Sequence, residues 1–184
     1  MEEKVLFNGI KDGETFEVAG MTFIKFPDTD GKTPVVMRGI AFNSRYGECN
    51  DLRKSPIMDR LQSEILPKIV EAVGEENVCS FETDLTCLDG LSPYGTMTSR
   101  ISLPTMDFYR RHVAIFDAHN PDVWWWLATP ESAEPHYSPN FSLCVSPSGC
   151  LDFNVYNRGI GVRPFLIFNS CIFGSEEQLW QTMI

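Results

Sequence analysis

The sequence is poor in basic residues, with 15 lysines and arginines against 25 aspartates and glutamates, which gives a formal net charge of -10 at pH 7. Binding to a phosphate backbone needs clustered lysine and arginine side chains. We therefore expect no nucleic-acid partner. A net charge far from zero favours a soluble surface that repels other copies of itself.

Long apolar runs are missing as well. No stretch approaches the ~20 apolar residues of a membrane-spanning helix. The first residues, Met-Glu-Glu-Lys, carry neither the basic nor the apolar region of a secretory signal. We expect a cytoplasmic protein without a membrane partner, and the sequence leaves open whether it associates with a virion. It also leaves the oligomeric state open.

Paired cysteine motifs are absent, although the chain has six cysteines. A chain of this length without an export signal does not need a disulfide framework, so we expect six reduced thiols. The closer pairs, Cys79 with Cys87 and Cys144 with Cys150, lack the neighbouring histidines of zinc sites with ordinary spacing. We predict no metal site and no cofactor.

The most distinctive stretch is residues 122–130, where three of the four tryptophans are consecutive and a proline ends the run. Side chains alternate between the two faces of a strand, which places Trp125 with Leu127 on one face and Trp126 on the other. Both faces are apolar, so we predict a buried strand between the core and a second layer. The alternative is that one of the indoles lies at a surface site.

Turn residues divide the rest of the chain into short strands, as expected for one domain over residues 1–184. Alternation of apolar and polar residues predicts strands at 15–18, 21–26, 34–41, 141–145, 150–156 and 162–168. A short strand over 78–81 is also expected. We interpret 42–54, 82–99 and 157–161 as irregular, and the tail 174–184 as a short helix or a frayed end.

Two helices are predicted between these strands. Ser55 before Pro56, and later Thr105, have the residue types of helix N-caps. Gly74 suits the end of the first helix. Pro67 lies inside that helix and should kink or split it.

Three sequence blocks follow one another in the second half of the chain: RISLPTMDFYR at 100–110, WWLATP at 125–130 and GVRP at 161–164, with the turn VSPSG before the last. In this order they resemble a bacterial and phage domain family of unassigned function, which looks like a branch of the C-type-lectin-like fold. The variable proteins of diversity-generating retroelements share the late pattern. The resemblance spans roughly residues 10–170. It implies an α+β fold of antiparallel strands with two flanking helices.

The chain departs from the better-known members of that fold. Calcium-dependent lectins use Glu-Pro-Asn or a similar set, with a later Trp-Asn-Asp. This chain has only Glu134-Pro135-His136 and no Trp-Asn-Asp. The resemblance therefore does not imply calcium-dependent sugar binding. The pair Cys144 and Cys150 also lacks the motif that surrounds the cysteines of formylglycine-generating enzymes.

A polar and aromatic set flanks the last predicted hairpin, and its residue types are those enriched in recognition surfaces. The candidate ligand-binding residues are His136, Tyr137, Asn140, Asn154, Tyr156, Asn157 and Arg158. Nothing selects a catalytic residue, since His112 and His119 suit ordinary positions on or after a helix. Arg163 is expected to hold an ion pair or backbone carbonyls.

These observations predict a non-enzymatic recognition module for a protein or glycan surface. The alternatives are a cytoplasmic enzyme or a phage accessory protein of unknown chemistry, or loops that bind nothing. An enzyme should present a deep pocket with convergent titratable groups, whereas a binding module should present a shallow aromatic face.

Overall fold

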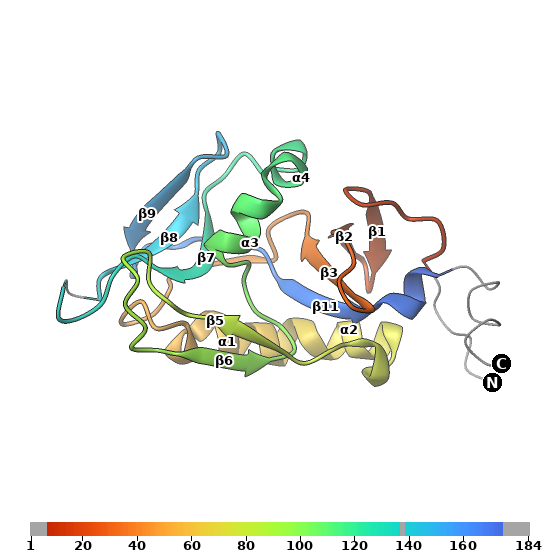
Figure 1. The fold of residues 1–184 in the computed structure, drawn as a ribbon, viewed down its shortest axis with the longest axis horizontal. Coiled ribbons are helices and arrows are strands. Elements are labelled where there is room, and N and C mark those ends of the chain that lie inside the picture. Colours follow the sequence, from red (N-terminus) through yellow and green to blue (C-terminus); the bar gives the residue numbers. More distant parts are fainter. Residues whose placement is uncertain (1–6, 137–138, 175–184) are drawn as a thin grey trace.

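The computed structural model describes residues 7–136 and 139–174, so the expected tail element lies almost wholly outside the described residues. The fold is α+β and mostly antiparallel (Figure 1). One sheet has the strand order β1-β2-β3-β11, a second has the order β4-β10-β7-β8-β9, and β5 pairs with β6.

The four-stranded sheet joins the beginning of the described chain to its end. Its strands are β1 (Thr15–Val18), β2 (Met21–Lys25), β3 (Lys32–Met37) and β11 (Phe165–Asn169). The predicted first hairpin is confirmed, with Phe16 opposite Phe23. Its two turn residues, Ala19 and Gly20, both have positive φ, as a tight hairpin turn with right-handed twist requires.

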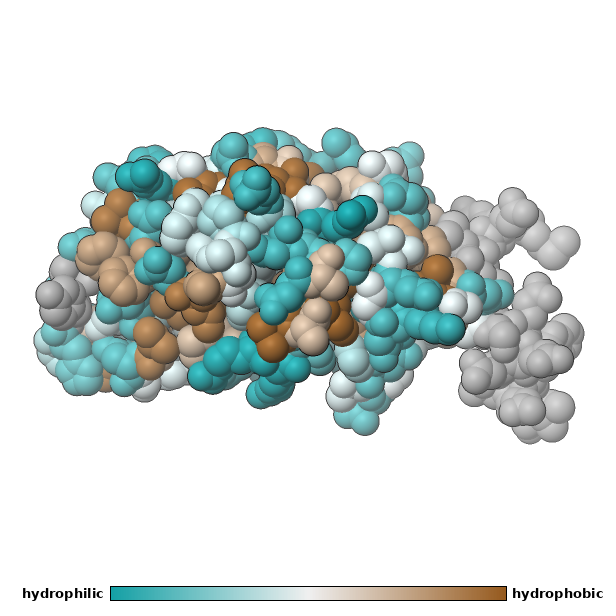
Figure 2. Space-filling view, turned by 90° about the horizontal axis from the view of Figure 1, so that it is seen from above, coloured by the Kyte–Doolittle hydropathy of each residue, from teal (hydrophilic) through white to brown (hydrophobic). Residues whose placement is uncertain are grey.

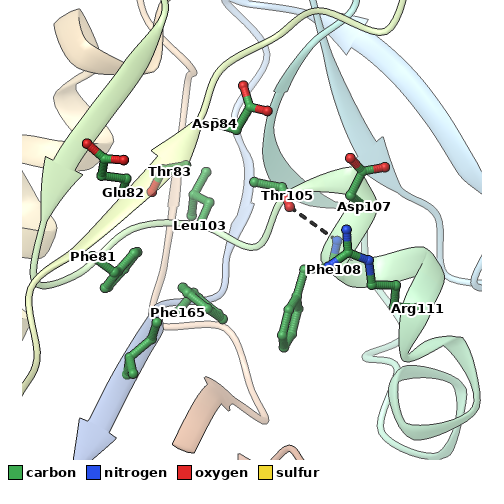
Figure 3. Close-up of a pocket in the computed structure, with 11 residues that line it drawn as sticks. Phe81, Glu82, Thr83, Asp84, Leu103, Thr105, Asp107, Phe108, Arg111 and Phe165 are labelled. Atoms are coloured by element: carbon green, nitrogen blue, oxygen red, sulfur yellow. Dashed lines mark hydrogen bonds between the residues drawn. The ribbon is translucent and has the colours of Figure 1, made fainter. Parts of the chain in front are cut away.

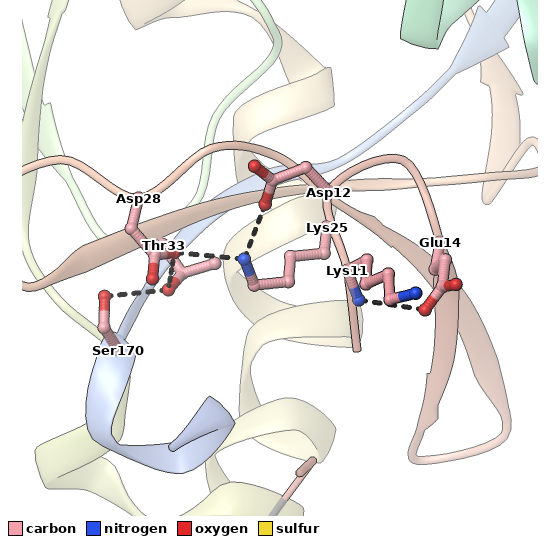
Figure 4. Close-up of polar contacts among 7 residues, drawn as sticks. All are labelled: Lys11, Asp12, Glu14, Lys25, Asp28, Thr33 and Ser170. Atoms are coloured by element: carbon pink, nitrogen blue, oxygen red, sulfur yellow. Dashed lines mark hydrogen bonds and ion pairs between the residues drawn. The ribbon is translucent and has the colours of Figure 1, made fainter. Parts of the chain in front are cut away.

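A polar network ties this sheet together at Lys25, which is buried (Figure 4). The ammonium nitrogen lies 2.7 Å from an oxygen of Asp12 and 3.4 Å from an oxygen of Asp28. The Thr33 hydroxyl donates to the same Asp28 oxygen at 2.6 Å and lies 2.9 Å from the Ser170 hydroxyl. Because buried lysines need such partners, the network connects the first loop, two strands and the chain after β11.

The first helical region begins and ends where the sequence predicts. Its segments are α1 (Pro56–Arg60), the π-helical turn η2 (Leu61–Ile65) and α2 (Leu66–Val73). The Ser55 hydroxyl accepts the Ile57 N–H, and Gly74 ends the helix at φ 89°. Pro67 follows the π turn, in which the backbone N–H donor and its carbonyl acceptor are one residue further apart along the chain than in an α-helix. This wider turn accommodates a proline that would clash in a regular α-helix.

The second helical region begins after Thr105 as expected but is broken at His112, whose φ and ψ are -123° and 25°. Its two parts are α3 (Met106–Arg111) and α4 (Val113–Ala118). Thr105 is the N-cap, as predicted, and its hydroxyl accepts the Phe108 N–H at 3.2 Å. Three short 3-10 helices complete the helical segments: η1 (Leu52–Lys54), η3 (Glu75–Asn77) and η4 (Ser170–Phe173).

The five-stranded sheet contains two strands in stretches expected to be irregular. Its strands are β4 (Phe42–Ser44), β10 (Ile160–Val162), β7 (Trp125–Pro130), β8 (Phe141–Val145) and β9 (Leu151–Val155). Strand β10 runs parallel to β7, with Gly161 opposite Trp125. A Cβ at Gly161 would come within 3.0 Å of the Trp124 carbonyl oxygen and 2.6 Å of the Ile40 side chain, so a larger residue would require both neighbours to shift.

The prediction of a loop over residues 82–99 is wrong. Strand β5 (Phe81–Asp84) pairs with β6 (Thr96–Ser99) in an antiparallel hairpin, and only residues 85–95 connect them. Strand β6 is rich in hydroxyl residues, β5 carries two acidic residues, and neither strand has a clear apolar alternation. Pairing between the two segments stabilises them as strands, although their sequence pattern does not indicate strands by itself.

The tryptophan strand lies between two apolar clusters, and its face assignment is confirmed. Trp125 and Leu127 pack with Phe116 in one cluster, whereas Trp126 and Ala128 belong to the other. Every residue of β7 is buried. Helices α3 and α4 cover the Trp125 face, so this strand is the shared wall of the two clusters (Figure 1).

Candidate recognition surface

The structure brings several predicted ligand-binding residues together at the end of the β8–β9 hairpin. The Tyr156 N–H donates to the Asn140 carbonyl at 2.9 Å, which joins the two ends of the hairpin. Asn154 lies opposite Ser142 in the ladder. Asn157 and Arg158 are exposed just after β9. Tyr137, predicted with them, lies outside the described residues.

Tyr156 makes packing contacts and backbone hydrogen bonds that the sequence does not indicate. Its side chain is half-buried and packs against the cluster that contains Trp126. Its carbonyl accepts the N–H groups of Tyr46 at 2.7 Å and Gly47 at 3.2 Å. Loss of the Tyr156 side chain should therefore destabilise the fold, because removing the ring exposes part of this packing.

His136 lies apart from the hairpin end and contacts the loop between β5 and β6. Its Nδ1 is 3.2 Å from an oxygen of Asp89, and the Ser132 hydroxyl donates to the same oxygen at 2.5 Å. The Ser132 bond, with help from the Leu91 N–H and His136, lowers the pKa of Asp89. Catalytic triads place the histidine between the serine and the carboxylate. Here the carboxylate is central, so the group tethers two loops and does not activate the serine.

Apolar residues on the same hairpin are also exposed, which the sequence does not indicate. Phe153 is 50% exposed and Leu151 is 38% exposed, although their positions in β9 alternate as core residues would. Phe153 packs edge-to-face on Phe141, with ring centroids 5.4 Å apart. Figure 2 shows hydrophobic residues among hydrophilic ones at the end of the molecule that carries this hairpin. We call Phe141, Leu151, Phe153, Asn157 and Arg158 the hairpin-edge surface.

The exposure of these side chains follows from the position of β9 in the sheet. Strand β9 is the last in its sheet order, and within residues 7–136 and 139–174 no strand pairs with its outer side. Across the sheet, Leu143 and Val145 face the same side as Phe153 and are buried in the cluster under α3 and α4. Helices α3 and α4 therefore cover β8 on this face but not β9, which leaves Phe153 accessible.

A buried asparagine holds the loops next to this surface. The Asn50 amide donates to the carbonyls of Ser132 and Phe141, both at 2.8 Å. Its oxygen accepts the Tyr94 hydroxyl at 2.8 Å. All of these groups belong to different segments of the chain, so Asn50 connects them in one arrangement. A preorganised surface loses less entropy when it binds.

The two buried cysteines, Cys87 and Cys144, lie in environments that disfavour a reactive thiolate. Burial raises the pKa of the Cys87 thiol to about 11 and that of Cys144 to about 12, whereas a reactive cysteine needs a lowered value. Burial lowers the pKa of His112, which packs against Phe26 and Phe108. His119 Nε2 lies 2.8 Å from the Gly13 carbonyl.

The part of the chain that the structure describes contains no group of three histidine, cysteine, aspartate or glutamate side chains that could hold a metal ion. Nor does it contain a helix long and apolar enough to cross a membrane. All six cysteines are free.

Comparison of the chain with protein-family models, curated proteins and solved structures finds no match. The family resemblance therefore stays a prediction from the sequence blocks.

Proposed function

We propose that this protein is a non-enzymatic recognition module that binds a protein or glycan surface through the hairpin-edge surface. The observation that carries the proposal is Phe153, an aromatic side chain half exposed on β9, whose outer side pairs with no strand in the described part of the chain. Exposed aromatic residues surrounded by polar ones are typical of the centre of an interface. Asn157 and Arg158, both exposed, supply adaptable and charged contacts beside it.

The edge of β9 adds a second mode of contact. An edge strand presents unpaired N–H and C=O groups, which can pair with an extended segment of a partner protein. Alternate side chains of β9 would then face the partner on the side of Leu151 and Phe153. Apolar contacts would supply affinity, and the backbone ladder would set the register.

We further propose that the fold is C-type-lectin-like. Three features support it: β3 near the start of the chain pairs with β11 near the end, two helical regions flank the strands, and the glycine of GVRP lies opposite the first tryptophan of WWLATP in β7. A cytoplasmic location and a phage origin remain parts of this proposal. The alternative function is an enzyme or phage accessory protein of unknown chemistry, and the thiol environments favour binding over covalent catalysis.

A binding screen on combined glycan and protein arrays tests the function. The wild-type protein is compared with Phe153→Ser and with Val113→Ser, which removes a similarly exposed apolar side chain from α4, 44% exposed against 50% for Phe153. We expect wild-type signals on a subset of spots, unchanged in the α4 variant and reduced about thirtyfold or more in the Phe153 variant. Equal binding by all three proteins would place the recognition surface elsewhere, and no binding at all would favour the enzyme alternative.

A further inference from the structure

A hollow of about 270 Å³ lies between β5, α3 and β11, away from the hairpin-edge surface (Figure 3). Three phenylalanine rings form much of its wall. Phe165 makes edge contacts with Phe81 and with Phe108, at centroid distances of 5.1 and 4.9 Å. Leu103 and Ile167 extend this apolar lining. Such a wall fits an aromatic or branched aliphatic group.

The hollow also contains a buried hydroxyl without a partner. Thr83 lines it and is only 3% exposed, yet its Oγ1 makes no hydrogen bond to any described residue. Thr83 is two positions after Phe81 on β5, so both side chains lie on the same side of the strand. A buried hydroxyl normally finds a partner, because leaving it unpaired costs stability. A bound ligand can supply that partner.

Two further hydrogen-bond donors surround the same space. Thr105 Oγ1 accepts the Phe108 N–H as a helix cap, which leaves its hydroxyl hydrogen free to donate. Arg111 is exposed on α3, and within the described ranges no carboxylate lies within ion-pair distance of it. Figure 3 shows its guanidinium directed toward the space beside Thr105. The neighbouring Asp107 pairs with Arg110 instead.

The carboxylates of the lining have a different orientation. Glu82 and Asp84 alternate with Phe81 and Thr83 along β5 and are exposed. In Figure 3 their carboxylates point away from the aromatic rings. Thr83, Thr105 and Arg111 are therefore the donors of the lining. Glu82 and Asp84 stand at its outer side, Asp107 is paired with Arg110, and together these carboxylates disfavour a ligand with several negative charges.

We propose that this hollow binds a small monocarboxylate with an apolar body, such as an aryl or branched alkyl carboxylate. The apolar body packs among Phe81, Phe108 and Phe165. The carboxylate accepts hydrogen bonds from Arg111 and from the threonine hydroxyls. A guanidinium matches a carboxylate in geometry as well as in charge. The carboxylate belongs to a free metabolite or to the C-terminal residue of a peptide, and both present the same chemistry.

Amide chemical shifts of the isotope-labelled protein, titrated with phenylacetate, test the proposal. We expect saturable shifts at Thr83, Thr105 and Phe108, at millimolar concentrations suited to a small ligand. Phenylacetamide and phenethylamine, which keep the ring but lose the negative charge, should bind about tenfold more weakly or worse. An acetylated dipeptide that ends in phenylalanine tests the peptide source, and binding of either carboxylate supports the site.

Two variants separate binding from folding. Arg111→Met should weaken phenylacetate binding about tenfold, whereas Arg38→Met, which removes an exposed arginine outside the hollow, should leave it unchanged. Thr83→Val should also weaken binding while it keeps or raises the melting temperature, because it removes an unpaired buried hydroxyl. The proposal is overturned if neither carboxylate perturbs the amides of the hollow, if the amine binds as well as the acid, or if the Arg111 variant binds like wild type.

Discussion

The guanidinium of Arg163 lies 4.6 Å from the centre of the Trp125 ring, and both side chains are fully buried. Arg163 Nε donates to the Met37 carbonyl at 3.0 Å, so the prediction that it bonds backbone carbonyls is confirmed. Within the described residues no carboxylate pairs with it, and burial lowers its pKa to about 9. The two motifs WWLATP and GVRP thus meet in a contact between a cation and an aromatic face, beside the strand pairing of Gly161 with Trp125.

Replacing Arg163 should destabilise the protein because the Met37 carbonyl loses its donor. An unpaired buried polar group costs about 1–3 kcal/mol. Arg163→Lys should cost at least as much as Arg163→Met, since lysine retains a buried charge without the planar group that stacks on Trp125. Urea unfolding at neutral pH measures both free energies. Wild-type stability in the lysine variant would show that the charge alone matters.

Trp125→Ala should cost about 3–5 kcal/mol of unfolding free energy, because it removes a fully buried indole from the wall shared by both apolar clusters. This is a large share of the ~5–15 kcal/mol of a typical domain. Val123→Ala is the matched control, since Val123 is 45% exposed just before the strand and should change stability by about 0.5 kcal/mol or less. A wild-type melting temperature for the tryptophan variant would contradict its position in the core.

The six thiols should separate by reactivity in the native protein. Cys150 and Cys171 are exposed and should be alkylated quickly. Cys87 and Cys144 are buried with raised pKa values and should react only after unfolding, because the thiolate is the reactive form. Alkylation followed by mass spectrometry measures the order, and titration in denaturant without reductant should count six thiols. A lower count would reveal a disulfide.

The loop tether at Asp89 should be sensitive to acid. The folded pKa of this carboxyl lies below its ordinary value, so the stabilisation that it contributes is present above about pH 4 and is lost as the pH falls through the folded pKa. The Leu91 N–H donates to Asp89 Oδ1 at 3.1 Å, so this amide group is a probe of the tether. Its hydrogen exchange, corrected for the intrinsic rate, should accelerate only at acid pH. Asp89→Asn, which keeps an acceptor but does not titrate, is the control.

The elements that the sequence predicted are those whose ends carry a local signal. The caps at Ser55 and Thr105, the end at Gly74 and the turn at Gly149 all depend on neighbouring residues only. The missed strand β10 depends on a partner far along the chain, because its parallel pairing with β7 has no sequence signature.

The site was less predictable for a similar reason. Phe153 alternates like a core residue, and its exposure follows only from the strand order, which places β9 at the edge. The hollow beside Thr83 and Arg111 depends on β5, which the sequence presents as part of a loop. Composition identifies residue types suited to recognition, but the layers of the fold decide which of them stay accessible.

Arg158 and Tyr156 should respond differently to truncation, although the sequence groups them in one ligand-binding set. Arg158 is exposed, so Arg158→Ala should leave unfolding free energy within about 0.5 kcal/mol of wild type. Tyr156 packs against the Trp126 cluster, so Tyr156→Ala should cost about 1–3 kcal/mol. Chemical unfolding of the two variants measures this difference.

If the arginine belongs to the recognition surface, its loss weakens binding to any array ligand by about 2 kcal/mol, roughly thirtyfold in affinity, without a change in melting temperature. Unchanged binding in Arg158→Ala, with Phe153→Ser still impaired, would confine recognition to the apolar part of the hairpin-edge surface.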